Sequence, residues 1–219
     1  MVKVVRSYPA PESLAVEAAK KNGSYKEKDV VERLKSDFND KCYICEIKDL
    51  QDPEVEHLLP HKNGMYPERK FDWDNLFWAC GHCNKVKNNE KYDDGIIDCC
   101  KQDPEALLKF SLAGDDVDIR AINVDDSQSV LTATLIYETF NLRNTGIRIA
   151  ACDTRMDELR KAMIVLYKEL EKYQRKPESE RNRRMMRVLL SRSSAFAAFK
   201  RGYVREHLNE YPGLKEYVC

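Results

Sequence analysis

Two Cys-x-x-Cys pairs, Cys42–Cys45 and Cys80–Cys83, constrain this sequence more than any other feature. Each pair presents two thiolates on one side of a tight turn, and together they supply the four tetrahedral ligands of a structural zinc ion. The 34 residues between the pairs are acceptable because the entropic cost of closing a loop grows slowly with its length. We therefore predict structural Zn²⁺ on Cys42, Cys45, Cys80 and Cys83, with two redox pairs or unrelated thiols as the alternative.

The composition is that of an ordinary globular chain. Of its 219 residues 42% are hydrophobic, no apolar run approaches the length that a bilayer requires, and the N-terminus lacks the apolar core of a signal peptide. We therefore expect a cytoplasmic protein that does not contact a membrane. In a reducing compartment, paired cysteines favour a metal over disulfides. The other cysteines have no ligand spacing and are expected to be ordinary thiols: Cys99, Cys100, Cys152 and Cys219.

Periodic apolar residues predict helices before and after the cysteine-rich segment and short strands within it, while residues 1–9 look extended and loose. The expected elements up to the second pair are helices over 11–22 and 26–38, strands over 55–59 and 76–79 separated by a loop over 61–72, and a helix from Asn84 with Lys85 and Lys87 exposed. The elements expected after this helix are a short strand over 96–98, a helix over 103–108, a hairpin of strands 110–113 and 117–122 turning at 114–116, and helices over 129–140, 153–173 and 178–208.

This order predicts a mainly α protein with a small α+β zinc-bound module. We expect three regions, which are a helical N-terminal segment (1–40), the zinc-bound module (41–100), and a hairpin followed by a helical C-terminal region (101–219). The apolar stripes of the long helices are interpreted as packed core between helices.

Glu56, His57 and Asn84 form the chemical constellation of the module. Neighbours in a strand point to opposite faces, so Glu56 and His57 share a site only if the strand ends or bulges there, as Pro60 favours. Carboxylate and amide oxygens suit Mg²⁺, and a neutral imidazole beside them can take a proton from water. The alternative is a solvated carboxylate, a strand-end histidine and a helix N-cap. Because one zinc-bound frame contains all three residues, we favour a site that hydrolyses phosphodiesters.

With these motifs, residues 42–87 resemble an HNH endonuclease of the treble-clef, ββα-metal type with a four-cysteine zinc site. The resemblance rests on Glu56-His57-Leu58-Leu59-Pro60, on Asn75-Leu76, and on Asn84 directly after the second cysteine pair. It implies that His57 is the general base, that Glu56 and Asn84 hold catalytic Mg²⁺ or Mn²⁺, and that Asn75 fixes the loop and orients His57. Many members have histidine where this chain has Asn84, which affects the expected metal preference more than the expected activity.

A wider pattern is similar to the HNH subunit of Septu-type and retron-associated anti-phage defence systems. The similar stretches are residues 56–61, 71–80, 83–87 and the Phe-Asn-Leu-Arg-Asn of 140–144. Those nucleases work with an ABC/SMC-like ATPase, so the resemblance implies a DNA substrate and an ATPase partner in a hetero-oligomer.

The expected hydrolysis leaves 5′-phosphate and 3′-hydroxyl ends. We expect Lys85, Lys87, His61 and His82 to contact phosphates near the scissile bond, the alternative for the two lysines being a solvated helix face.

Charge is unevenly distributed along the chain. The formal net charge is zero, yet ten Lys or Arg lie within residues 175–205. This basic segment could bind a DNA backbone, dock on an acidic partner, or be a solvated helix face. The zero net charge of the whole chain favours a nuclease that a partner recruits or restrains.

Other functions remain open at this point. A non-catalytic zinc-ribbon adaptor would bind nucleic acid or protein, but it need not keep Glu56, His57 and Asn84 together. A redox protein would use the cysteine pairs without zinc. Homing or restriction activity stays within the nuclease class, although no DNA-reading segment is evident.

Overall fold

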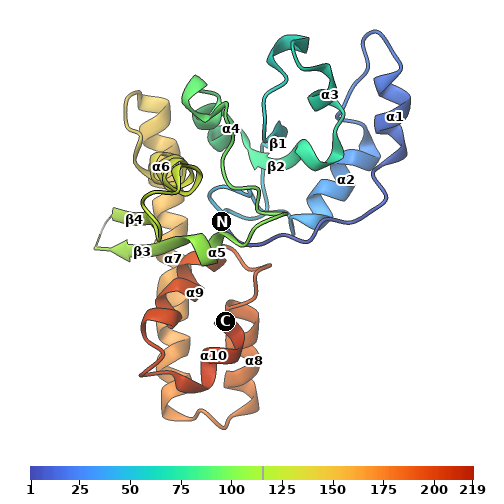
Figure 1. Cartoon of the computed structure of the whole chain (residues 1–219). Helices are drawn as coiled ribbons and strands as arrows, with labels where there is room; N and C mark the ends of the chain where they lie inside the picture. Colours follow the sequence, from blue (N-terminus) through green and yellow to red (C-terminus); the bar gives the residue numbers. More distant parts are fainter. Residues whose placement is uncertain (115) are drawn as a thin grey trace.

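Two small antiparallel sheets lie among helices in the computed structural model, which describes residues 1–114 and 116–219 (Figure 1). The first sheet pairs β1 (Pro53–His57) with β2 (Leu76–Cys80) and places His57 opposite Leu76. The second pairs β3 (Leu108–Ala113) with β4 (Asp116–Ala121). Asp115, in the predicted turn of this hairpin, lies outside the described residues. The predicted fold class, mainly helical with small sheets around the cysteine cluster, is confirmed.

The helices fall into a group around the first sheet and a second group that lies beside this sheet and extends below it (Figure 1). The first group is α1 (Glu12–Ala18), α2 (Lys28–Asp37), α3 (Pro67–Lys70) and α4 (Gly81–Lys87), with 3-10 turns at Lys62–Gly64, Trp73–Asn75 and Glu90–Tyr92. The second is α5 (Pro104–Leu107), α6 (Ser127–Asn141), α7 (Gly146–Arg175), α8 (Glu180–Leu189), α9 (Ala197–Glu206) and α10 (Lys215–Val218), with a 3-10 turn at Pro212–Leu214. No helix in the described ranges combines the length and apolarity needed to cross a bilayer.

Several predicted bounds shift, with α7 beginning at Gly146 rather than at 153, and two predicted elements are not formed as expected. The single helix expected over 178–208 is wrong, because residues 190–196 separate α8 from α9. Phe196 there has a φ of 51°, a left-handed conformation that a continuous right-handed helix excludes. The strand expected over 96–98 is also wrong. The Ile97 N–H donates to the side chain of Thr132 on α6 (2.9 Å), not to a neighbouring strand.

The N-terminal residues are packed rather than loose, contrary to expectation. Met1 and Val2 are buried, and the Arg6 side chain is buried between the N-terminal segment and the first sheet. Arg6 donates to the carbonyls of Trp73 and Leu76, both at 2.8 Å, and its guanidinium lies over the ring of Trp73. A buried guanidinium needs such acceptors because an unpaired one is costly.

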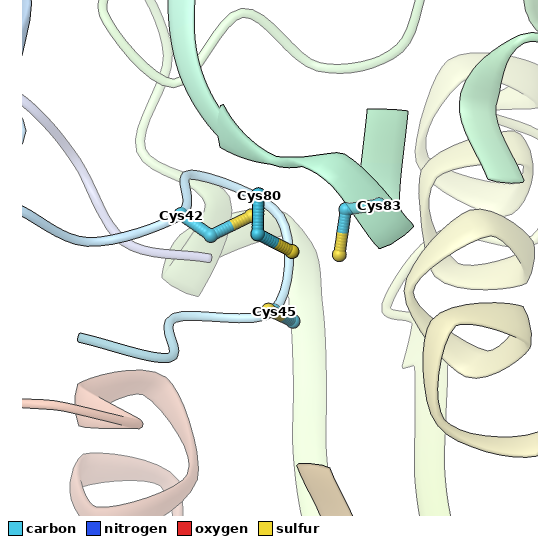
Figure 2. Close-up of side chains that lie close together, drawn as sticks. All are labelled: Cys42, Cys45, Cys80 and Cys83. Carbon is cyan, nitrogen blue, oxygen red and sulfur yellow. The ribbon is translucent and has the colours of Figure 1, made fainter. Parts of the chain in front are cut away.

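The four predicted zinc ligands converge on one point (Figure 2). Their sulfur atoms lie within 4.8 Å of one another and all four residues are buried: Cys42, Cys45, Cys80 and Cys83. In a tetrahedral site with Zn–S bonds of about 2.3 Å the sulfurs are about 3.8 Å apart, so the cluster fits zinc with little movement. This geometry supports a structural zinc ion.

Arg155 of α7 ties the cysteine cluster to the long helices. Its Nη2 donates to Sγ of Cys80 at 2.8 Å, and the side chain is buried. Burial disfavours the guanidinium charge, but the neighbouring cysteines outweigh this effect and raise the pKa of Arg155. A cation at this place offsets part of the negative charge of four thiolates around one Zn²⁺.

Glu105, just inside α5, joins the second sheet to the C-terminal helices. Its buried carboxylate pairs with Arg192 (3.1 Å), with Arg201 (2.7 Å) and with Arg205. These three arginines belong to the predicted basic segment, so part of that segment's charge is internal. A buried carboxylate is tolerated here because several donors satisfy it.

Loss of one zinc ligand should unfold the module. Cys83→Ser replaces a thiolate by a hydroxyl that stays protonated, so we expect the zinc content to fall from about one ion per chain to near zero. Structural zinc contributes about 10 kcal/mol or more in small modules, comparable to the stability of a whole domain. Metal analysis and near-ultraviolet circular dichroism of Trp73 and Trp78 measure both effects. Cys219→Ser, at an exposed thiol, is the control, and full zinc in Cys83→Ser would contradict the assignment.

Removing the charge of Glu105 should destabilise the C-terminal half. Glu105→Gln leaves the buried guanidinium of Arg201 without a counter-charge, and we expect the free energy of unfolding to fall by about 3 kcal/mol. Urea denaturation measures it. Glu178→Gln, at an exposed position, should change stability by less than about 0.5 kcal/mol. Equal effects of the two substitutions would show that the arginine cluster is not stabilising.

Candidate active site

A cavity of about 610 Å³ opens between the end of β1, the loop that follows it, and the end of α4. Glu56, His57 and Asn84, the predicted catalytic constellation, all line it. Glu56 and His57 reach one cavity although they are neighbours because β1 ends at His57, as the position of Pro60 indicated. The structure therefore brings together residues from two elements that are well separated in the sequence.

His57 is held in one tautomer. Its Nε2 lies 3.0 Å from the carbonyl oxygen of Lys70, and a carbonyl only accepts, so Nε2 carries the proton and Nδ1 keeps a lone pair. Burial, reinforced by the neighbouring His61, lowers the pKa of His57 to about 4 against the effect of that hydrogen bond. The imidazole is therefore neutral near pH 7, the form that a general base requires.

Asn75 holds the loop that follows His57. Its Oδ1 accepts the N–H of Leu59 (2.8 Å), and its Nδ2 donates to the carbonyls of Leu59 (2.9 Å) and Arg69 (3.0 Å). The side chain is buried, so these bonds form away from competing water. The loop leading to Lys70, whose carbonyl oxygen accepts from His57, is thereby fixed.

Glu56 is buried between two partners that the sequence did not reveal. One carboxylate oxygen lies 2.7 Å from Nζ of Lys87, and the other accepts from the Tyr43 hydroxyl at 2.7 Å. Burial raises the pKa of Glu56, although Lys87 and Tyr43 oppose the shift. Each carboxylate oxygen has a second lone pair, so both can still accept a further ligand.

Lys87 is buried, and its predicted exposure is wrong. Besides Glu56, its ammonium donates to the carbonyls of His57 (3.0 Å) and Leu58 (2.9 Å). These three contacts use all three ammonium hydrogens. Lys87 therefore fastens the end of α4 to the end of β1.

Asn84 lies in the middle of α4, which begins at Gly81 rather than at Asn84 as predicted. Its Nδ2 donates to a carboxylate oxygen of Glu54, a residue that sequence analysis missed. Glu54 and Glu56 are two positions apart in β1 and so share a face, a signal that strand alternation could have given. Among the residues that the structure describes, no hydrogen bond uses Oδ1 of Asn84.

The donor set fits a hard divalent cation. Asn84, which has an amide oxygen, and Glu56, which has a carboxylate, both line one cavity that has room for water molecules. Mg²⁺ binds through one or two such oxygens, several waters and the phosphate of its substrate. Because Lys87 offsets part of the Glu56 charge, we expect the substrate phosphate to contribute to metal binding.

The four predicted phosphate contacts are placed differently from one another. His61 lines the cavity with its ring centroid 4.8 Å from that of His57, and Lys85 is exposed on α4. His82 is turned toward α6, where its Nε2 lies 3.0 Å from the carbonyl of Thr139, and it does not line the cavity. Lys85 does not line the cavity either, and Lys87 lines it but is buried and paired with Glu56, so His61 is the best placed of the four for a phosphate in the cavity.

The HNH endonuclease family matches residues 42–90, the segment that contains the cysteine cluster, β1, β2 and α4. Comparison with curated proteins and with solved structures gave no match. The matched segment carries His57 and Asn84 in one cavity beside the zinc-type cluster. Residues 42–90 are therefore an HNH endonuclease domain, and the protein is a nuclease that hydrolyses phosphodiester bonds of nucleic acid.

Proposed function

We propose that the protein is a metal-dependent DNA endonuclease whose general base is His57 and whose catalytic Mg²⁺ or Mn²⁺ is held by Glu56 and Asn84. One observation carries the proposal. His57, whose Nδ1 bears no proton, and Asn84, whose Oδ1 accepts no hydrogen bond from the described residues, line the same cavity.

His57 would take a proton from the attacking water at Nδ1. The Lys70 carbonyl keeps the imidazole in the tautomer that leaves Nδ1 free and stabilises the imidazolium that forms. Asn75 would hold the loop between His57 and Lys70, so that the ring and its acceptor keep their relative position.

A bound divalent ion would polarise the scissile phosphate and stabilise the leaving 3′-oxygen. The chain's part is to orient the two oxygen donors. Glu54 would fix the amide plane of Asn84, and Tyr43 with Lys87 would fix the Glu56 carboxylate. Hydrolysis in this arrangement leaves 5′-phosphate and 3′-hydroxyl ends. His61 and Lys85 would contact flanking phosphates.

We further propose that this nuclease is the effector of an anti-phage defence system in the cytoplasm, together with an ABC/SMC-like ATPase. The support is the sequence similarity of residues 56–61, 71–80, 83–87 and 140–144 to Septu-type and retron-associated nucleases. The zero net charge also favours recruitment by a partner over autonomous tight binding of DNA.

Replacing the base should abolish cutting without loss of the fold. We expect His57→Ala to lower the rate of supercoiled plasmid nicking in Mg²⁺ by about 10²- to 10⁴-fold, because the proton acceptor is gone, while zinc content stays unchanged. His207→Ala, at the C-terminal end of α9 and outside the cavity lining, is the matched control and should cut like the wild type.

Equal cutting by His57→Ala and wild type would refute the assignment of the base. If neither cuts, the assay is repeated with an ATPase encoded beside the gene. Activity that appears only with the ATPase supports the defence proposal, whereas activity of the chain alone that the ATPase does not change argues against it.

Removing the amide oxygen should weaken use of the metal. We expect Asn84→Ala to raise the Mg²⁺ concentration for half-maximal nicking and to lower the maximal rate, whereas Asn84→Asp keeps an oxygen donor and retains activity. Mg²⁺ and Mn²⁺ titrations of the nicking rate measure the difference. Identical titration curves for Asn84→Ala and wild type would exclude Asn84 as a ligand.

A further inference from the structure

One wall of the active-site cavity comes from outside the HNH domain. Tyr25 and Lys26, between α1 and α2, line the cavity although the family match begins only at residue 42. In Figure 1, α1 and α2 lie on the same side of the first sheet as α3. The N-terminal segment thus reaches the catalytic histidine directly.

This wall is held by specific contacts. The Ser24 N–H donates to the Glu17 carboxylate (2.9 Å), and Nζ of Lys70 donates to the carbonyl of Gly23 (2.9 Å). A Cβ atom at Gly23 would lie 1.9 Å from the carbonyl oxygen of Glu17, so glycine is required where the chain turns back on α1. The segment is therefore built into the fold in a defined position.

The same Lys70 links the wall to His57. Its side chain holds Gly23, and its carbonyl accepts from Nε2 of His57. The Tyr25 ring meets the His57 ring edge to face, with centroids 4.6 Å apart and planes at 71°. No hydrogen bond of the described residues uses the Tyr25 hydroxyl, so the ring itself makes the contact. Tyr25 and Lys70 thus hold the imidazole from two sides.

Of the three lysines that line the cavity, Lys26 is the one without a carboxylate partner among the described residues. Lys87 is paired with Glu56, and Lys62 is paired with Asp93 at 2.8 Å. Lys26 is exposed, and its ammonium lies 5.5 Å from the Tyr25 ring centroid at the edge of the cavity. Within the described part of the chain it has no ion-pair partner.

We propose that residues 23–26 form a substrate-binding wall of the nuclease site, in which Lys26 binds a phosphate neighbouring the scissile one and Tyr25 positions His57. The inference rests on the proposed function and extends the active site beyond the HNH domain. A phosphate on Lys26 would place the backbone of the nucleic acid along this wall and over His57.

The role of Lys26 is tested by binding, separately from cutting. In a His57→Ala background, the affinity for a labelled DNA duplex is measured by fluorescence anisotropy over a range of salt concentrations. Lys26→Ala should weaken binding several-fold and reduce the slope of log K against log salt by about 0.9, the loss of one phosphate contact. Lys28→Ala, two residues on, exposed and outside the cavity, is the control. Equal affinities and slopes for the two variants would overturn the role of Lys26.

The role of Tyr25 is tested by kinetics and spectroscopy. Tyr25→Ala should lower kcat roughly tenfold to a hundredfold with little change in KM, because the base is displaced while substrate contacts remain. Tyr25→Phe keeps the ring and should restore kcat. Nitrogen-15 spectra of His57 should report a single Nε2-protonated tautomer in the wild type and in Tyr25→Phe, and a tautomer mixture in Tyr25→Ala. Unchanged kcat and spectra in a folded Tyr25→Ala would overturn the positioning role.

These outcomes separate the inference from the proposed function. If wild-type protein cuts but the variants match their controls, residues 23–26 are not part of the site. If wild-type protein does not cut even with the ATPase present, the proposed function fails, while the anisotropy and the histidine spectra still decide whether this wall binds nucleic acid and orients His57.

Discussion

The cluster of four cysteine thiols connects three structural elements of the chain. Cys42 and Cys45 belong to a turn after α2, Cys80 ends β2, and Cys83 lies in α4. Since β1 pairs only with β2 in the described sheet, its position depends on the strand that the cluster fixes. Asn84 directly follows a thiolate ligand, and His57 lies across the sheet from Leu76. A structural zinc ion on this cluster would thus fix the distance between His57 and Asn84, the residues that we propose as base and metal ligand.

The pair of Glu56 and Lys87 illustrates why a buried ion pair can be kept at little net gain in stability. Removing two charges from water costs several kcal/mol, and their attraction at 2.7 Å offsets this cost only with further hydrogen bonds. Tyr43 supplies one to Glu56, and two strand-end carbonyls accept from Lys87. This network fixes the position of the end of β1 relative to the end of α4, the two elements that carry His57 and Asn84.

Spacing in the sequence was sufficient for features that depend on local chemistry. The cysteine pairs, the two strands between them and the placing of Glu56, His57 and Asn84 in one cavity follow from ligand geometry, alternation and a strand-ending proline. Burial of Lys87 was missed because it depends on a carboxylate on a distant strand. The contacts of Tyr25 and Arg6 were missed for the same reason, since apolar periodicity carries no information on which distant segment a polar side chain meets.

In the C-terminal half, apolar periodicity predicted more regular structure than the chain forms. An apolar stripe continues from Met186 to Tyr203, so periodicity predicted one helix, but the left-handed Phe196 turns the chain so that α9 packs against β3 and α8 against α7.

This turn also redistributes the basic segment. Arg192, Arg201 and Arg205 pair with the buried Glu105, whereas Arg181, Arg184 and Arg187 remain exposed on α8. A run of like charges in a sequence therefore overstates the positive surface that a nucleic acid meets. In a chain of zero net charge, attraction for a phosphate backbone must be local, and Lys26 at the edge of the cavity is the cation that we propose for it.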